Sequence, residues 1–116
     1  MSVRRAVVET YMEGFRRSDH ARILATLTSD VVWVIHGHRT TRGVDEFDSE
    51  IENPAFEGSP ELTAERTLED GNVVVVTGEG RGKVRGGGPF GFVFCDLFTF
   101  RGNLIERVDS YVVPLP

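Results

Sequence analysis

The sequence has only one cysteine, Cys95, among its 116 residues, so no disulfide can form within the chain. Proteins without disulfides are typical of reducing compartments, and we expect a cytoplasmic location. The chain also lacks an apolar run of the roughly 20 residues that a membrane-spanning helix requires. Its first stretch, "MSVRRAVVETYMEG", is too polar for a signal peptide. We therefore expect no membrane partner.

The chain also has fewer basic residues than acidic ones. The chain has 13 lysines and arginines against 18 aspartates and glutamates, which gives a formal net charge of -5. A general nucleic-acid binder needs a basic face, so we expect no nucleic-acid partner. Of the three histidines only His36 and His38 lie close together, and a zinc site needs at least three protein ligands. We therefore expect no metal and no other cofactor.

Helical spacing is present in the first half of the chain. Near the N-terminus, apolar side chains recur every fourth residue, and Ser2 is placed to cap this first helix. The stripe consists of Val3, Val7, Tyr11 and Phe15. The stretch "RRSDHARILATL" predicts a turn and a short second helix, and Val44, Phe47 and Ile51 predict a third.

The remaining segments have the spacing of strands. The stretch "DVVWVIHG" is β-branched and aromatic, and it predicts a first strand. Asp70-Gly71-Asn72 predicts a hairpin turn between two long extended runs, and Gly102-Asn103 a turn before the last strand. The pattern indicates an α+β fold in which a curved sheet encloses a pocket. The length suits one domain over residues 1–116.

A carboxylate interrupts a row of phenylalanines in the stretch "FVFCDLFTF". Because alternate residues of a strand share one face, Asp96 lies in line with Phe92, Phe94, Phe98 and Phe100. Burial on such a face disfavours the charged form of a carboxyl group. Asp96 therefore needs either a partner or a function.

The register of the last hairpin decides which side chains accompany Asp96. If Gly102-Asn103 are the two central turn residues, Asp109 lies opposite Asp96, and Arg107 and Tyr111 share its face. Two neighbouring carboxylates would divide into a proton donor and a proton acceptor, with Arg107 keeping one of them charged. A slip of one residue would exchange the two faces. The purely structural alternative is a buried ion pair between Asp96 and Arg107 without a catalytic role.

Three stretches of the chain resemble the NTF2-like superfamily, and within it the SnoaL-like and ketosteroid-isomerase-like branch. They are "VVETYMEGFRRSDHARILATLTSDVVWVIHG", "FCDLFTFRGN" and "LIERVDSYV". The resemblance covers nearly the whole chain. It implies an α+β cone with three N-terminal helices packed on a curved, mixed, mostly antiparallel sheet. The same fold carries isomerases, cyclases, hydrolases and non-enzymatic binding modules, so it implies no single activity.

The resemblance also implies roles for individual residues. Ketosteroid isomerases hold a developing oxyanion with a helix tyrosine and a strand aspartic acid, positions that Tyr11 and Asp96 match. A gapless match places Ile35 where that family has its carboxylate base, with His36 next to it. His36 or Asp109 would then act as the base. The chain also resembles limonene epoxide hydrolase, an NTF2-like enzyme. The Asp-Arg-Asp site of that enzyme has the same residue types as Asp96, Arg107 and Asp109.

Together these patterns predict a cofactor-independent isomerase, cyclase or hydrolase that acts on a small hydrophobic molecule by acid–base chemistry. A non-catalytic binding or dimerisation module with the same pocket is the alternative, and a purely structural dimer is a third hypothesis. The expected catalytic residues are Tyr11, His36, Asp96, Arg107 and Asp109. The expected pocket walls are Phe15, Trp33, Ile35, Phe47, Phe94, Phe98 and Tyr111.

The other face of the phenylalanine strand is apolar as well. Val93, Cys95, Leu97 and Thr99 alternate with the phenylalanines, and so small a domain needs a cover for an apolar sheet face. The resemblance implies that pairing of two sheets supplies it. We therefore expect a homodimer through the convex face, with Cys95 as a packing residue.

Overall fold

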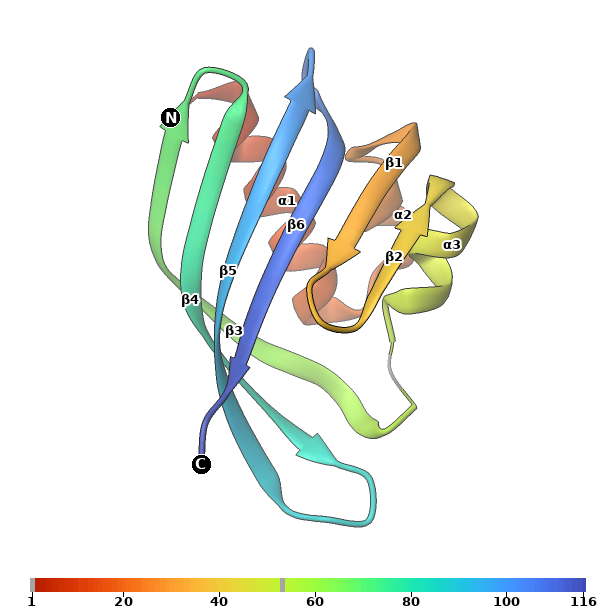
Figure 1. The fold of residues 1–116 in the computed structure, drawn as a ribbon, viewed down its shortest axis with the longest axis vertical. Coiled ribbons are helices and arrows are strands. Elements are labelled where there is room, and N and C mark those ends of the chain that lie inside the picture. The colour runs from red at the N-terminus through yellow and green to blue at the C-terminus, as the bar shows by residue number, and fades with distance from the viewer. Residues whose placement is uncertain (1, 53) are drawn as a thin grey trace.

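The computed structural model describes residues 2–52 and 54–116, which form three helices and six strands. Figure 1 shows the helices grouped on one side of a single curved sheet. The helices are α1 (Val3–Arg17), α2 (His20–Leu24) and α3 (Gly43–Glu50). The strands are β1 (Leu27–Ile35), β2 (Arg39–Arg42), β3 (Phe56–Asp70), β4 (Val73–Val84), β5 (Pro89–Arg101) and β6 (Leu104–Pro114).

All three predicted helices are present, and their ends have local causes. The hydroxyl of Ser2 accepts a hydrogen bond from the backbone N–H of Arg5, which satisfies a free donor at the start of α1. Asp19 caps α2 in the same way through the N–H of Arg22. Ser18 adopts the left-handed conformation that ends α1 and turns the chain into α2.

The sheet is mixed, with the strand order β2-β1-β6-β5-β4-β3. β1 and β6 are parallel, and every other neighbouring pair is antiparallel. This agrees with the predicted α+β fold and its mostly antiparallel sheet. The edge strand β2 was not predicted, because its four residues "RTTR" are too few for a periodic pattern.

The core lies between the helices and the inner face of the sheet. Phe94, Phe98 and Phe100 are buried on this face, so the predicted row of phenylalanines is confirmed, and Asp96 shares their side of β5. The other buried apolar residues come from α1, α2, α3 and the remaining strands. They are Val8, Tyr11, Met12, Ile23, Leu27, Val31, Trp33, Phe47, Val74, Val76, Ile105 and Val108.

The predicted register of the last hairpin is wrong beyond its first two pairs. Phe100 pairs with Ile105, but Thr99 pairs with Arg107, so Glu106 is an extra residue in β6. Such a β-bulge reverses the faces of all residues that follow it. Asp96 consequently lies opposite Ser110 and not opposite Asp109.

The bulge moves three predicted site residues to the outer face of the sheet. Arg107 pairs with Thr99, Asp109 with Leu97 and Tyr111 with Cys95, and all three partners point away from the phenylalanine row. The predicted pair of carboxylates therefore does not form, and neither does an ion pair between Asp96 and Arg107.

Three glycines of β4 lie opposite phenylalanines of β5. The pairs are Gly78 with Phe94, Gly80 with Phe92 and Gly82 with Phe90. A methyl group on Gly80 would lie 2.1 Å from Cζ of Phe92, and one on Gly82 would lie 2.6 Å from Cε1 of Phe90. The rings therefore occupy the space that side chains on β4 would need, and they lie across the neighbouring strand.

Across residues 2–52 and 54–116, no helix combines the length and the apolar composition that crossing a membrane requires.

The close packing at Gly78 leads to a stability prediction. A methyl group there would lie 2.1 Å from the backbone oxygen of Thr63, so β3 or β4 must move to admit it. We expect Gly78→Ala to lower the free energy of unfolding by about 1–3 kcal/mol, measured by urea denaturation.

Gly88→Ala is the matched control. Apart from its two chain neighbours, no atom of the described residues lies within 4 Å of a methyl group on Gly88, and its φ is outside the left-handed region. Its free energy of unfolding should stay within about 0.5 kcal/mol of the parent value. Equal losses in the two variants would contradict the packing described for Gly78.

Candidate functional site

A cavity of about 130 Å³ lies between α1 and the inner face of the sheet. Its walls come from α1, β1, β3, β5 and β6, so it sits where the curved sheet closes on the first helix. The lining residues are Tyr11, Met12, Phe15, Trp33, Ile35, Leu62, Phe92, Phe94, Asp96, Ser110 and Val112. Most are apolar, and Tyr11 and Asp96 are the only acidic or basic side chains among these lining residues.

The cavity has a closed end and an open end. Tyr11 and Met12 are each 2% exposed and Phe94 is 7% exposed, so they form the closed end. Val112 is 47% exposed, and Leu62 and Phe92 are half-buried. The open end is therefore on the side of Leu62, Phe92 and Val112.

Asp96 places a carboxyl group on the apolar wall of this cavity. Its Oδ1 atom is shielded from solvent and has no hydrogen-bond partner among the described residues. Burial raises the pKa of Asp96 to about 6, and a hydrogen bond from Ser110 opposes this rise. The carboxyl group can therefore gain or lose a proton near neutral pH.

Ser110 and Trp33 hold the other side of this carboxyl group. The indole Nε1 of Trp33 donates a hydrogen bond to Oγ of Ser110 at 2.9 Å. Because Ser110 accepts from Trp33, its single hydroxyl proton is free for Asp96, its cross-strand partner. The orientation of Asp96 thus depends on two neutral groups and not on a counter-charge.

Tyr11 supplies the second polar group in the cavity. It is 2% exposed, and its ring packs edge-on against Phe98 with centroids 4.9 Å apart. Burial, and secondly the charge of Asp96, raise the pKa of Tyr11 well above its ordinary range. Its hydroxyl group stays protonated and can donate a hydrogen bond to a ligand oxygen.

The structure divides the predicted pocket walls into three groups. Phe15, Trp33, Ile35 and Phe94 line the cavity. Phe47 and Phe98 are completely buried and do not line it. Instead they support the wall from behind, because Phe47 stacks on Trp33 at 4.4 Å and Phe98 contacts Tyr11.

The third group is Tyr111, which lies on the outer face of the sheet. Three of the predicted catalytic residues lie there with it: His36, Arg107 and Asp109. Asp109 accepts hydrogen bonds from Nε and Nη2 of Arg107 at 2.9 and 3.0 Å, and its Oδ1 is 3.0 Å from Nε2 of His36. The His36 ring stacks on Tyr111 with centroids 4.1 Å apart. The four side chains satisfy one another outside the cavity, so none of them acts inside it.

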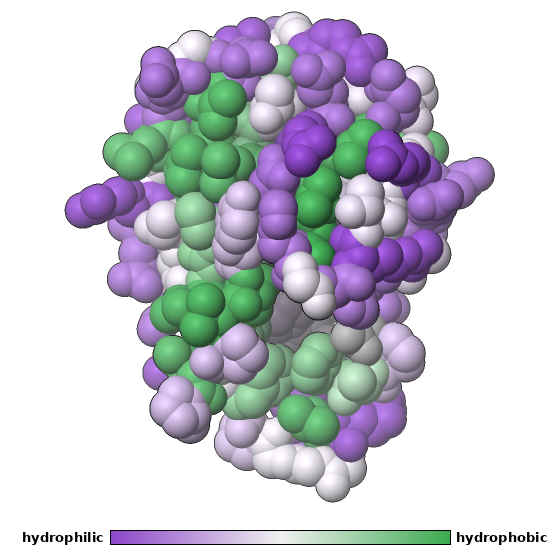
Figure 2. Space-filling view, in the orientation of Figure 1, coloured by the Kyte–Doolittle hydropathy of each residue, from purple (hydrophilic) through white to green (hydrophobic). Residues whose placement is uncertain are grey.

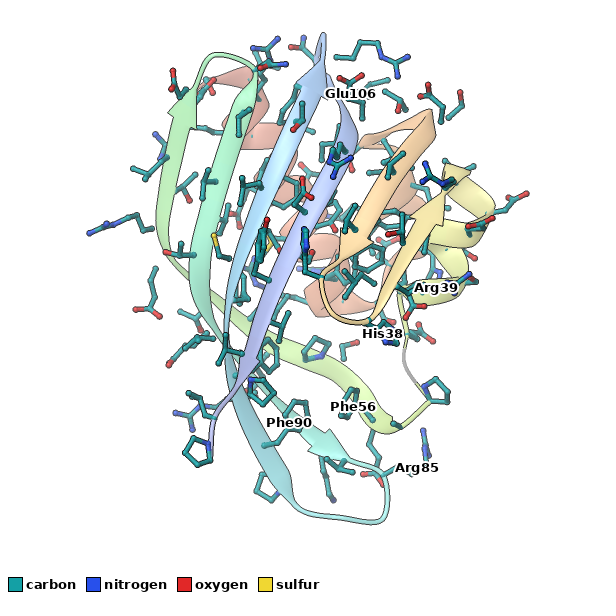
Figure 3. All side chains as sticks on the ribbon, viewed as in Figure 1. His38, Arg39, Phe56, Arg85, Phe90 and Glu106 are labelled. Carbon is teal, nitrogen blue, oxygen red and sulfur yellow. The ribbon has the colours of Figure 1, made fainter. Side chains whose placement is uncertain are left out.

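The neighbouring histidine also has its own partner. Nε2 of His38 lies 3.3 Å from Glu50, and Nη1 of Arg39 donates to the same carboxylate at 2.9 Å. Figure 3 shows His38 and Arg39 together at the turn between β1 and β2. His36 and His38 thus bind different carboxylates.

Four lining residues were not predicted from the sequence: Met12, Leu62, Ser110 and Val112. Phe92, which belongs to the row of phenylalanines, also lines the cavity. Ser110 and Val112 were missed because of the bulge at Glu106. A signal was available, since Ile105 and Val108 are apolar residues three apart, and in a regular strand they would face opposite sides. Both are completely buried.

Solved structures with the NTF2-like fold align with nearly the whole chain. An NTF2-like protein of unknown function from Burkholderia pseudomallei is 23% identical, with a TM-score of 0.89 over 97% of this chain and 92% of that chain. A candidate polyketide cyclase from Xanthomonas campestris is 21% identical, with a TM-score of 0.84 over 94% and 89%. An LEH-like epoxide hydrolase from M. tuberculosis is 18% identical, with a TM-score of 0.82 over 96% and 83%.

At these identities the likeness shows the fold alone, which is the NTF2-like α+β fold. Within that class, residues 8–108 match the model of the SnoaL-like domain, and the chain belongs to this family. No curated protein matches the sequence.

The raised pKa of Asp96 leads to a prediction about stability and pH. Between the ordinary value of 3.8 and the folded value of about 6, the folded protein keeps a proton that the unfolded chain has lost. The free energy of unfolding therefore falls as pH rises through this window. Asp96→Asn removes that loss, so its stability relative to the parent should increase by up to ~3 kcal/mol from pH 4 to pH 7.

Asp109→Asn is the control, and its stability relative to the parent should change with pH in the opposite direction. The hydrogen bond from Arg107 is the main cause that lowers the pKa of Asp109, so its carboxylate stabilises the fold at neutral pH and loses this effect as pH falls through the folded pKa. This variant should be less stable than the parent at pH 7, and the deficit should shrink in acid. Urea denaturation from pH 3 to 7 measures both. A pH-independent difference for Asp96→Asn would contradict the buried neutral carboxyl group.

Proposed function

We propose that this protein is a cofactor-independent enzyme that moves a proton within a small hydrophobic carbonyl compound. The observation that carries the proposal is the Asp96 carboxyl group, which has an unpartnered oxygen on an apolar wall, a pKa near 6 and a tyrosine hydroxyl nearby. A catalytic acid–base group works best when its pKa lies near the working pH.

The walls of the cavity support a hydrophobic substrate. Aromatic and aliphatic side chains surround the two polar groups, which matches small-molecule sites where a few polar atoms orient an apolar ligand. A closed apolar wall also strengthens the hydrogen bonds made inside it.

The roles of the two polar groups follow from their protonation states. Tyr11 keeps its proton, so it can donate to the oxygen of a substrate carbonyl. Above pH 6 Asp96 is mostly ionised and can take a proton from the carbon next to that carbonyl. The electrons of the broken C–H bond move to the carbonyl oxygen, where the hydrogen bond from Tyr11 stabilises the negative charge.

The proton on Asp96 then completes either of two reactions. Its return to a different carbon gives an isomer. If the carbanion first attacks a second carbonyl group of the same molecule, a ring closes and the proton goes to the new alkoxide oxygen. Both reactions balance without a co-reactant, and both use one carboxyl group, which is what the described lining residues provide.

An epoxide hydrolase of the Asp-Arg-Asp kind is not supported. That chemistry would need Arg107 and Asp109 beside Asp96, but both lie on the outer face and bind each other. The position that the family resemblance assigns to a strand carboxylate is occupied by Ile35, an apolar lining residue. Asp96 is therefore the candidate base, and Tyr11 the candidate oxyanion donor.

Hydrogen–deuterium exchange between heavy water and hydrophobic ketones tests the proposed proton transfer. We expect the parent protein to catalyse the exchange of hydrogens next to the carbonyl, with a rate that rises with pH and levels off above pH 6. Asp96→Asn should lower the rate by about 10²–10⁴-fold, and Tyr11→Phe by about 10²–10³-fold. Mass spectrometry of the recovered ketone measures the exchange.

Asp109→Asn is the matched control, since it removes a carboxylate of β6 that faces away from the cavity. It should keep the parent rate. If the parent protein binds the ketones without exchanging their hydrogens, the non-catalytic binding module is the correct description and the enzyme proposal fails.

We also propose that two copies pair through the outer face of the sheet. Val93, Tyr111 and Val113 are 38%, 43% and 58% exposed on this face, and Val93 pairs directly with Val113. Figure 2 shows hydrophobic residues gathered on the face of the sheet toward the viewer, interrupted by a polar band. A second copy would remove these residues from water.

Sedimentation at micromolar concentration tests the pairing. We expect a dimer for the parent, and a monomer for Val113→Glu, because a buried unpaired carboxylate is costly. Val3→Glu places the same charge on an equally exposed valine of α1, which is 60% exposed, and should stay dimeric. A parent protein that sediments as a monomer would contradict the proposal.

A further inference from the structure

The cavity is small for the substrates that such pockets usually hold. Its volume of about 130 Å³ is close to that of an engineered apolar cavity of roughly 150 Å³ that binds benzene. Pockets that enclose drug-sized ligands measure roughly 300–1,000 Å³. A substrate larger than one ring must therefore extend out of the open end, past Phe92 and Val112.

Three phenylalanine rings form a surface that starts at this open end, and we call it the aromatic shelf. It consists of Phe92, which lines the cavity, followed by Phe90 on the same face of β5 and Phe56 at the start of β3. The Phe90 and Phe92 rings are 5.7 Å apart at 23°, and the Phe56 and Phe90 rings are 4.7 Å apart at 21°. All three side chains are half-buried.

The shelf lies where the helices do not cover the sheet. Figure 1 shows β3, β4 and β5 continuing past α1 as a curved extension, and Figure 3 shows Phe56 and Phe90 pointing toward each other on it. Since Phe92 belongs both to the cavity wall and to the shelf, one apolar path runs from Asp96 to Phe56.

Two features fix the shelf in place. Phe92 and Phe90 lie across Gly80 and Gly82, where a methyl group would collide with either ring. At the far end, Nε and Nη2 of Arg85 donate hydrogen bonds to the backbone oxygens of residues 54 and 56, at 3.1 and 3.3 Å. The backbone that carries Phe56 is thus tied to the turn that follows β4. A surface that is ordered before binding loses little entropy when a ligand lies on it.

We propose that the shelf binds a flat aromatic or conjugated tail of the substrate whose carbonyl head reacts at Asp96. This inference rests on the proposed function, and it adds the substrate class. Because Phe56 stacks on Phe90 and Phe90 on Phe92, the faces between these rings are occupied and the shelf offers ring edges. The edge of an aromatic ring packs favourably against the face of another flat ring system. Phe90 and Phe56 are then specificity-determining residues for the length of the substrate, although neither touches the reacting atoms.

Two aryl methyl ketones of different length test the inference. Acetophenone carries the reacting acetyl group on one ring, and 2-acetylanthracene carries it on three fused rings. We expect Phe90→Leu to raise the Kd of 2-acetylanthracene about five- to tenfold, since an edge-to-face aromatic contact is lost. The Kd of acetophenone should change less than twofold. Fluorescence titration measures the first ligand and calorimetry the second.

Phe56→Leu, on a different strand, should give the same pattern, so the test does not depend on one variant folding. Tyr111→Leu is the matched control, because it removes an aromatic ring from the outer face of the sheet, and it should leave both Kd values unchanged. The inference is overturned if the shelf variants change both ketones equally or change neither.

Deuterium exchange with the same two ketones separates this inference from the proposed function. Selective loss of 2-acetylanthracene binding, with no exchange of either ketone by the parent, supports the shelf and refutes the enzyme. Exchange of both ketones that depends on Asp96 but not on Phe90 or Phe56 supports the enzyme and refutes the shelf.

Discussion

One extra residue in β6 decides which side chains reach the cavity. Glu106 is bypassed in the pairing of β5 with β6, and because side chains alternate strictly along a strand, every later residue of β6 changes face. Ser110 therefore meets Asp96, while Asp109 turns outward with Arg107. In a regular strand Arg107 and Asp109 would have entered the cavity, and Asp96 would have had charged neighbours. Because of the bulge, the neighbours of Asp96 are neutral.

The neutral surroundings make the carboxyl group both costly and useful. Trp33 and Ser110 orient Asp96 without neutralising it, so its ionised form is destabilised by burial. The fold tolerates this because the walls around it are well packed, with Phe47 behind Trp33 and Phe98 behind Tyr11. The residues that stabilise the domain thus lie directly behind the wall that carries the destabilising carboxyl group, as is common where a site must hold a group in an unfavourable state.

Most of the fold follows from local signals in the sequence. Helical spacing and capping by Ser2 and Asp19 predict the helices, and alternation predicts the face of the phenylalanine row. Tyr11, Asp96 and four of the predicted wall residues lie on the cavity. The rest depends on longer-range information. A bulge changes register through one residue, and whether Phe47 lines a wall or supports it depends on how α3 packs against Trp33. The four-residue strand β2 is too short to have a period of its own.

The glycines of β4 have a consequence for the shape of the cavity mouth. Gly80 and Gly82 lie beneath the rings of Phe92 and Phe90, so any side chain introduced there would lift or tilt a ring at the mouth of the cavity. The positions of the shelf rings therefore depend on two residues that have no side chain of their own. Substitutions at these two positions would change the shape of the cavity mouth and leave Tyr11 and Asp96 at its closed end unaltered.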